Sequence, residues 1–213
     1  FITPGERLSV LKQDHFAYDE CEVIRTVLMG NPRLIEVMEE KDALYMKEDF
    51  SEEDGIKAGE LEAEFADMDG WNAESDAAFM LNKLGVPDEY HYMKMAELPS
   101  DMKVKVLLAQ ALFGNPDILL LDEPTKAFDE FSKNDLKSLL FELKAQGKTI
   151  IMVSHDLDFV GDIADNVSFL SDGIISKAGG RREVFSSLNF YTTQIRRITK
   201  RYLAFAVSMG DIL

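Results

Sequence analysis

The sequence predicts an α/β fold in which a parallel β-sheet carries an inserted helical subdomain. Two short apolar runs, 117–122 and 149–153, flank a segment of helical length at about 132–146, and this order is that of a βαβ unit. The unbroken apolar character of both runs is typical of parallel strands covered on both faces. Apolar residues within 36–76 instead recur at helical spacing, as Leu61 and Phe65 do, in a strongly acidic stretch.

Composition narrows the class of protein. The 213 residues are 46% hydrophobic, which is enough for one sizeable core. With 23 basic and 39 acidic residues the formal charge is −16, so the chain is a poor general ligand for nucleic-acid backbone or anionic membrane. A single cysteine excludes an internal disulfide framework, and no apolar run reaches the length of a transmembrane helix. We therefore expect a cytoplasmic protein that does not insert directly into a membrane.

The elements follow in order along the chain. A strand is expected at 7–12. Three helices are then expected at 32–49, 56–69 and 73–84, separated by turns near 51–55 and 70–72. Residues 36–76 hold 16 acids and 3 bases, which predicts either a solvated helical face or a contact with a basic partner. After the βαβ unit, further short strands are plausible at 167–170 and 174–177.

Ionisable side chains follow the two strands of the βαβ unit. Asp122 and Glu123 end the first, and His155 follows the second. Ligands of an open parallel sheet bind beyond the carboxyl ends of its strands. An aspartate there can hold Mg²⁺, a glutamate can orient or deprotonate an attacking water, and a histidine can hydrogen-bond a transferring phosphate.

These motifs resemble those of ATP-binding cassette (ABC) ATPases. Residues 118–125 (ILLLDEPT) resemble the family's Walker B segment, Asp129 matches the aspartate of its D-loop, His155 its switch histidine and Gln13 its Q-loop glutamine. The resemblance implies that Asp122 and Gln13 hold Mg²⁺ and that Glu123 is the catalytic carboxylate. It also implies that Gln13 and His155 sense the γ-phosphate of ATP, and it places Asp129 at the nucleotide.

The resemblance divides along the chain. Up to about residue 125 the sequence looks like an ABC-F protein, of the translation-associated branch; the cues are 4–8, 13–18, the acidic insert and 104–112. Beyond it the sequence looks more like the ATPases of energy-coupling-factor importers; the cues are 147–156, 172–173 and 189–193. The switch falls at Leu119–Thr125, which both branches share, and a crossover, a gene fusion or an artificial join would each produce it.

The family's phosphate loop, G-x-x-x-x-G-K-[ST], is missing from the sequence. Gly147-Lys148-Thr149 is a decoy, because Glu142 stands where the first glycine belongs and the triplet enters a strand rather than a helix. In the family this loop lies upstream of the Q-loop, beyond Phe1, so we expect an N-terminally truncated cassette. Each charge-assisted bond to phosphate contributes about 1.5–3 kcal/mol, so ATP binding would need a supplied loop.

The sequence also differs from the family signature Leu-Ser-Gly-Gly-Glu. Residues 98–102 read LPSDM, so Pro99 stands at the serine position and Asp101 at a glycine that should approach phosphate. A carboxylate there repels the γ-phosphate, and the close backbone approach of glycine is lost. Ser100 could bind nucleotide in place of the missing serine through a one-residue slip.

The resemblance implies a P-loop NTPase-like ABC cassette in four parts. These are the end of the N-terminal ATPase core with the Q-loop (1–20), an acidic helical subdomain (21–100), a catalytic core (101–180) and a basic helical tail (181–213). The expected function is an ABC-F-like, Mg²⁺-dependent ATP hydrolase, weak or inactive in this chain, that acts with a second cassette and with the ribosome as partner. The alternatives are a non-catalytic interaction module and the coupling ATPase of an importer.

Overall fold

The computed structural model describes residues 2–11, 16–126, 128–188, 191–203 and 205–212. The chain forms two compact units, each described by itself. The first comprises Phe1–Ala127 and Gly147–Ile151, and the second comprises Phe128–Gln146 and Met152–Leu213. None of the helices in these described ranges has both the length and the apolar character needed to cross a membrane.

The first unit is organised around a small sheet. Strand β1 (Leu8–Leu11) pairs in parallel with β2 (Ile118–Asp122), so that Leu8 lies opposite Ile118 and Leu11 opposite Leu121. Strand β3 (Thr149–Val153) completes the order β1-β2-β3. The predicted strands of the βαβ unit are therefore confirmed as neighbours, and the strand expected at 7–12 pairs with the first of them.

The two faces of this sheet differ in burial. Because side chains alternate along a strand, Leu11, Leu119 and Leu121 share one face, and all three are buried. On the other face Leu8 is 44% exposed and Val10 38% exposed. The expectation that the strands at 117–122 and 149–153 are covered on both faces is wrong for β3, where Ile151 is 52% and Val153 55% exposed, whereas every residue of β2 is buried or half-buried.

Three helices of the first unit contact one another and form its core. They are α1 (Val23–Leu28), α4 (Ala73–Lys83) and α5 (Ser100–Leu112). Helix α5 also contacts β1 and buries residues all round, as expected for a core helix. Gly30, just after α1, lies so close to α5 that a Cβ atom would be 2.0 Å from the carbonyl oxygen of Gln110.

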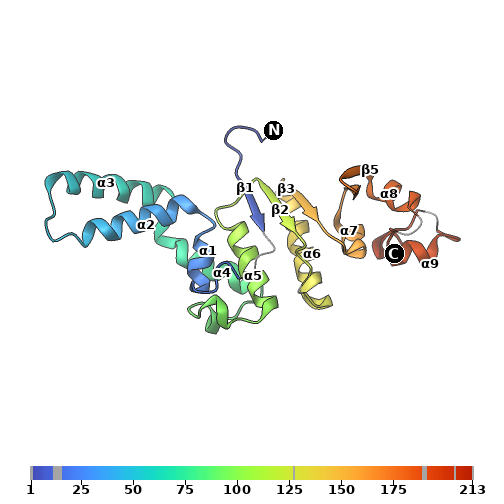
Figure 1. Cartoon of the computed structure of the whole chain (residues 1–213), viewed down its shortest axis with the longest axis horizontal. Helices are drawn as coiled ribbons and strands as arrows, with labels where there is room; N and C mark the ends of the chain where they lie inside the picture. The colour runs from blue at the N-terminus through green and yellow to red at the C-terminus, as the bar shows by residue number, and fades with distance from the viewer. Residues whose placement is uncertain (1, 12–15, 127, 189–190, 204, 213) are drawn as a thin grey trace. The chain divides into compact units, whose positions relative to one another are not determined.

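The acidic region forms a hairpin of two longer helices, α2 (Pro32–Tyr45) and α3 (Glu52–Asp67), which lie side by side (Figure 1). Helix α3 begins four residues before the predicted start, because Ser51 and Asp54 form a capping box that satisfies its first N–H groups. Helix α2 ends at Tyr45 rather than at residue 49. The S-x-x-D spacing could have located this helix start from the sequence.

Charged side chains join the two helices of the hairpin. The guanidinium of Arg33 makes a two-pronged bond to the carboxylate of Glu64, with N–O distances of 2.6 and 2.7 Å. Lys41 pairs with Glu62 at 2.8 Å and lies 4.0 Å from the centre of the Phe65 ring. Part of the acidic charge is therefore balanced within the hairpin itself.

The second unit contains a β-hairpin and four helices among its described residues. Its elements are α6 (Glu130–Ala145), α7 (Leu157–Ile163), β4 (Asn166–Ser171), β5 (Ile174–Gly180), α8 (Arg181–Ser187) and α9 (Gln194–Thr199). Strands β4 and β5 are antiparallel, and they confirm the two strands expected in this region. Short 3-10 turns lie at Gly70–Asn72, Asp88–Tyr90 and Met95–Glu97 in the first unit, and at Met209–Asp211 in the second.

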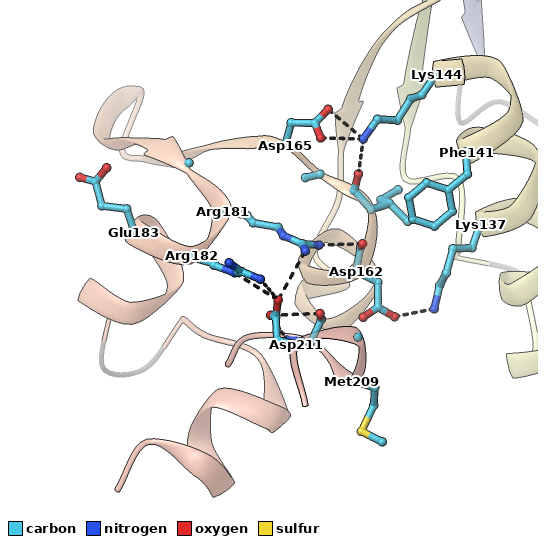
Figure 2. A pocket seen from close by; sticks show the side chains of 15 residues that line it. Lys137, Phe141, Lys144, Asp162, Asp165, Arg181, Arg182, Glu183, Met209 and Asp211 are labelled. Atoms are coloured by element: carbon cyan, nitrogen blue, oxygen red, sulfur yellow. Dashed lines mark hydrogen bonds and ion pairs between the residues drawn. The ribbon is translucent and has the colours of Figure 1, made fainter. Parts of the chain in front are cut away.

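Asp211 anchors the C-terminal segment of the second unit (Figure 2). Its side chain is 1% exposed, pairs with Arg182 and accepts hydrogen bonds from the backbone N–H groups of Val207 and Ser208, both at 3.0 Å. Burial alone would raise the pKa of Asp211, but these hydrogen bonds outweigh it and lower the pKa to about 2. The carboxylate is therefore held ionised at neutral pH.

The contact between Gly30 and α5 gives a test of the first unit. We expect Gly30→Ala to lower the free energy of unfolding by about 1–3 kcal/mol, because the methyl group would overlap the carbonyl of Gln110. Gly59→Ala is the matched control, because nothing lies within 4 Å of that Cβ position in the middle of α3. It should stabilise by about 0.5–1 kcal/mol through helix propensity. Urea denaturation measures both, and equal effects would contradict the packing described.

The Asp211 network gives a test of pH dependence. Because the folded pKa lies below the unfolded value of about 4, the stabilisation is fully present above pH 4 and is lost as the pH falls toward 2. We expect Asp211→Asn to lower the free energy of unfolding by about 1–2 kcal/mol at pH 7, with a smaller difference from the parent near pH 3. Asp135→Asn, at an exposed position on α6, is the control. A pH-independent difference for Asp211→Asn would argue against this network.

Candidate functional site

The first predicted site residues lie at the end of β2. Asp122 is the last residue of the strand, and Glu123 begins a turn with a left-handed backbone (φ 48°), which a residue with a side chain rarely adopts. The backbone N–H of Lys126 donates to the carbonyl of Glu123 at 3.2 Å, and Thr125 is buried. Two carboxylates therefore lie at the strand end, and the second of them, Glu123, has a backbone conformation that is costly to form.

Ser100 is the first residue of α5, directly after the extended Pro99. The N–H groups at the start of a helix attract anions, so this position suits a phosphate in principle. Asp101 occupies the same first turn and brings a negative charge to it. That carboxylate stabilises the helix dipole and at the same time disfavours a bound phosphate.

The remaining described candidates belong to the second unit. Asp129 caps α6, because its carboxylate accepts a hydrogen bond from the backbone N–H of Ser132 at 2.8 Å, and this cap starts the helix two residues earlier than predicted. The exposed His155 follows β3. Asp156, the next residue, caps α7 by accepting a hydrogen bond from the N–H of Phe159 at 3.1 Å.

The candidates are therefore divided between the two units. Asp122, Glu123 and Ser100 lie in the first, and Asp129 and His155 lie in the second. Gln13 lies outside the described residues. The structure adds Lys133, which sequence reasoning missed and which bonds to Asp156. Its position one turn after Asp129 in a predicted helix was the only signal that could have marked it.

Carboxylate oxygens are the donors that Mg²⁺ prefers, so Asp122 and Glu123 are chemically suited to it. In the described residues no group of three or more His, Cys, Asp or Glu side chains could hold a metal ion. Mg²⁺ usually takes one or two carboxylates and completes its shell with water and nucleotide phosphates. The residues of this turn fit an ion that arrives with a nucleotide rather than one enclosed by protein alone.

Two further features carry no nucleotide chemistry. The triplet Gly147-Lys148-Thr149 leads directly into β3, and the Lys148 ammonium lies 3.4 Å from the carbonyl of Asn115. A cavity of about 990 Å³ in the second unit is lined by α6, the end of α7, the start of α8 and the C-terminal turn (Figure 2). Its Lys137, Lys144 and Arg182 are each paired with an aspartate, so the cavity walls form a structural ion-pair network.

Comparison with known proteins identifies the family to which this chain is similar. A family model described as ABC transporter matches residues 4–126. The uncharacterized ABC transporter ATP-binding protein YkpA of Bacillus subtilis is 54% identical over 169 residues, which are 79% of this chain and 31% of that protein. The energy-coupling factor transporter ATP-binding protein EcfA3 of Oenococcus oeni is 31% identical over 166 residues, 78% of this chain and 52% of that protein.

A solved structure supports the same fold. The ATP-binding cassette MJ0796 bound to ADP and Pi superposes with a TM-score of 0.61 at 20% identity, covering 83% of this chain and 64% of that one. This confirms the predicted cassette fold of the P-loop NTPase type, with partial coverage. The chain spans about a third of YkpA and half of EcfA3. Because the family model matches more than half of the chain, the chain belongs to the ABC transporter family and is part of an ABC ATPase domain.

Proposed function

We propose that this chain is part of a Mg²⁺-dependent ATP hydrolase that drives a membrane transporter. The observation that carries the proposal is the strained turn after β2, which presents Asp122 and Glu123 at a strand end within an ABC fold. ABC ATPases use ATP and Mg²⁺, and the two carboxylates are chemically suited to the metal ion.

In the proposed mechanism each residue has one task. Asp122, with Gln13, holds the ion. Glu123 orients and deprotonates the attacking water, and His155 donates a hydrogen bond to the γ-phosphate. Asp129 binds near the nucleotide at the interface between two cassettes. When bound, Mg²⁺ neutralises charge that develops on the phosphate oxygens.

The proposal needs groups that these 213 residues do not contain. No G-x-x-x-x-G-K-[ST] loop occurs in the sequence, and Asp101 brings negative charge to the helix start where Ser100 would approach phosphate. We propose that the phosphates are held by a loop supplied from outside this segment, and that a second cassette completes the site. The chain alone is then a weak nucleotide binder.

The names of the relatives bear on the partner. EcfA3 is named as a transporter ATP-binding protein, and YkpA also carries the name of an ABC transporter. These names support the importer alternative rather than the translation-associated branch that the N-terminal half resembles. The direct partner would then be a membrane component of the transporter, contacted without insertion of this chain.

One observation favours the translation-associated branch as a second candidate. The α2–α3 hairpin is long and acidic, and it joins the rest of its unit mainly through the short α1 and the 3-10 turn after α3. Such a hairpin can reach a large partner, as the resemblance to ABC-F proteins implies. Ribosome binding is the property that would distinguish this candidate.

The role of Glu123 can be tested directly. In a protein that carries this segment behind a phosphate loop, Glu123→Gln should slow ATP hydrolysis by about 100-fold or more and leave Mg-ATP affinity in calorimetry within a few-fold of the parent. Glu89→Gln, at an exposed position, is the control and should keep full activity. Unchanged hydrolysis in Glu123→Gln, or no Mg-ATP binding in the parent, would favour a non-catalytic module.

The partner can be tested with the same variant. Held in its ATP-bound state, the Glu123→Gln protein should stay with its partner during fractionation of a lysate. Recovery with membrane vesicles that contain transporter components is the expected result. Co-sedimentation with ribosomes, abolished when residues 46–51 of the hairpin turn are replaced by a short glycine-serine link, would establish the second candidate instead.

A further inference from the structure

An ion pair in the second unit joins α6 to the turn that carries His155. The ammonium of Lys133 lies 2.6 Å from a carboxylate oxygen of Asp156, the residue after His155. The two side chains are 26% and 22% exposed. An ion pair shielded to this degree is held more firmly than a fully exposed one, because solvent screens it less.

Asp156 holds the backbone on both sides of itself. Its second carboxylate oxygen accepts a hydrogen bond from the N–H of Phe159 at 3.1 Å and so caps α7. Its own N–H donates to the hydroxyl of Ser154 at 3.1 Å. The bond to Ser154 spans His155, and the bond from Phe159 fixes Asp156 directly after it, so a change at Asp156 would alter the backbone next to the histidine.

Lys133 also belongs to the turn of helix that Asp129 caps. The N–H of Lys133 donates to the carbonyl of Asp129 at 3.0 Å, while the Asp129 carboxylate holds the N–H of Ser132. The first turn of α6 thus contains Asp129, which is predicted to lie at the nucleotide, and Lys133. Lys133 in turn bonds to the residue after His155, the predicted γ-phosphate sensor.

We propose that Lys133 is a positioning residue that, through Asp156, holds His155 at a set place relative to Asp129. The importance of this placement for ATP hydrolysis rests on the proposed function, whereas the placement itself does not. Movement of the first turn of α6 would be passed to His155 through this ion pair, and movement of His155 would be passed to α6 in the same way.

The charge states of the pair agree with this geometry. Burial alone would raise the pKa of Asp156, but the hydrogen bonds from Lys133 and Phe159 outweigh it and the pKa lies below its usual value. The hydrogen bond to Asp156 raises the pKa of Lys133. Both groups are therefore charged at neutral pH, and the pair persists over the whole physiological range.

Helix α6 supplies its own control. One turn further along, Lys137 pairs with Asp162 at 2.5 Å, and those side chains are 25% and 28% exposed. The two pairs match in chemistry, distance and exposure, but Asp162 lies near the end of α7, away from His155 in sequence. If the Lys133 ion pair only stabilised the unit, replacing Lys133 and replacing Lys137 would have the same effect on His155.

The experiment compares Lys133→Met with Lys137→Met in the 213-residue chain by NMR, without nucleotide. The chain has three histidines, so the ring signal of His155 can be assigned by substitution. The ring of the buried His91, which lies 3.0 Å from the carbonyl of Val86, reports whether the first unit stays folded. Lys133→Arg keeps a cation and serves as the conservative variant.

In Lys133→Met we expect a displaced His155 ring signal and amide exchange at Phe159 accelerated about five- to tenfold, with the His91 signal unchanged. Lys133→Arg should restore the parent spectrum, and Lys137→Met, whose ammonium acts on Asp156 only through space, should move both readouts much less than Lys133→Met does. An unmoved His155 signal in Lys133→Met, or equal shifts in the two methionine variants, would overturn the proposal. Because no nucleotide is present, failure of the proposed ATPase function would leave this result unaffected.

Discussion

The parallel pairing of β1 with β2 is the constraint on which the first unit depends. The register places Leu11 beside Leu121, so both strands turn the same buried face toward the helices. Asp122 then falls at the last position of the strand, and the chain must leave through the strained turn at Glu123. A one-residue slip would exchange the two faces, burying the open side and exposing the leucines. The same strand register therefore fixes both the burial of the leucines and the position of Asp122 at the strand end.

The second unit achieves order by a different means. Its described residues include short helices and a β-hairpin, and ion pairs join them in addition to a small apolar core that contains Leu140, Val184 and Phe185. Lysines along α6 pair with aspartates just before, within and after α7, and Asp211 joins the C-terminal turn to Arg182. Partly buried pairs of this kind add modest stability but define geometry, because each fixes a particular atom against a particular partner.

Sequence reasoning located most elements but misplaced several ends. The βαβ strands, the two strands at 167–170 and 174–177 and the acidic helices were all expected, because apolar spacing reports periodicity directly, whereas the antiparallel pairing of those two strands was not. The starts of α3 and α6 were set too late, since the capping residues Ser51 and Asp129 begin those helices before the first apolar position. The expected burial of both faces was wrong for β3, because the apolar sequence of a strand indicates its tendency to be buried and not which elements cover it.

The sequence by itself determined the family of this protein. The order of Asp122, Glu123, Asp129 and His155 along the chain is a local property that needs no coordinates, and the family match agrees with it. Only the tertiary structure decided which face of the sheet is open, that Gly30 must lack a side chain, and that Lys133 bonds to Asp156. These facts join residues distant in sequence, and a pattern along one chain contains no information about the distance between two side chains until the backbone has folded.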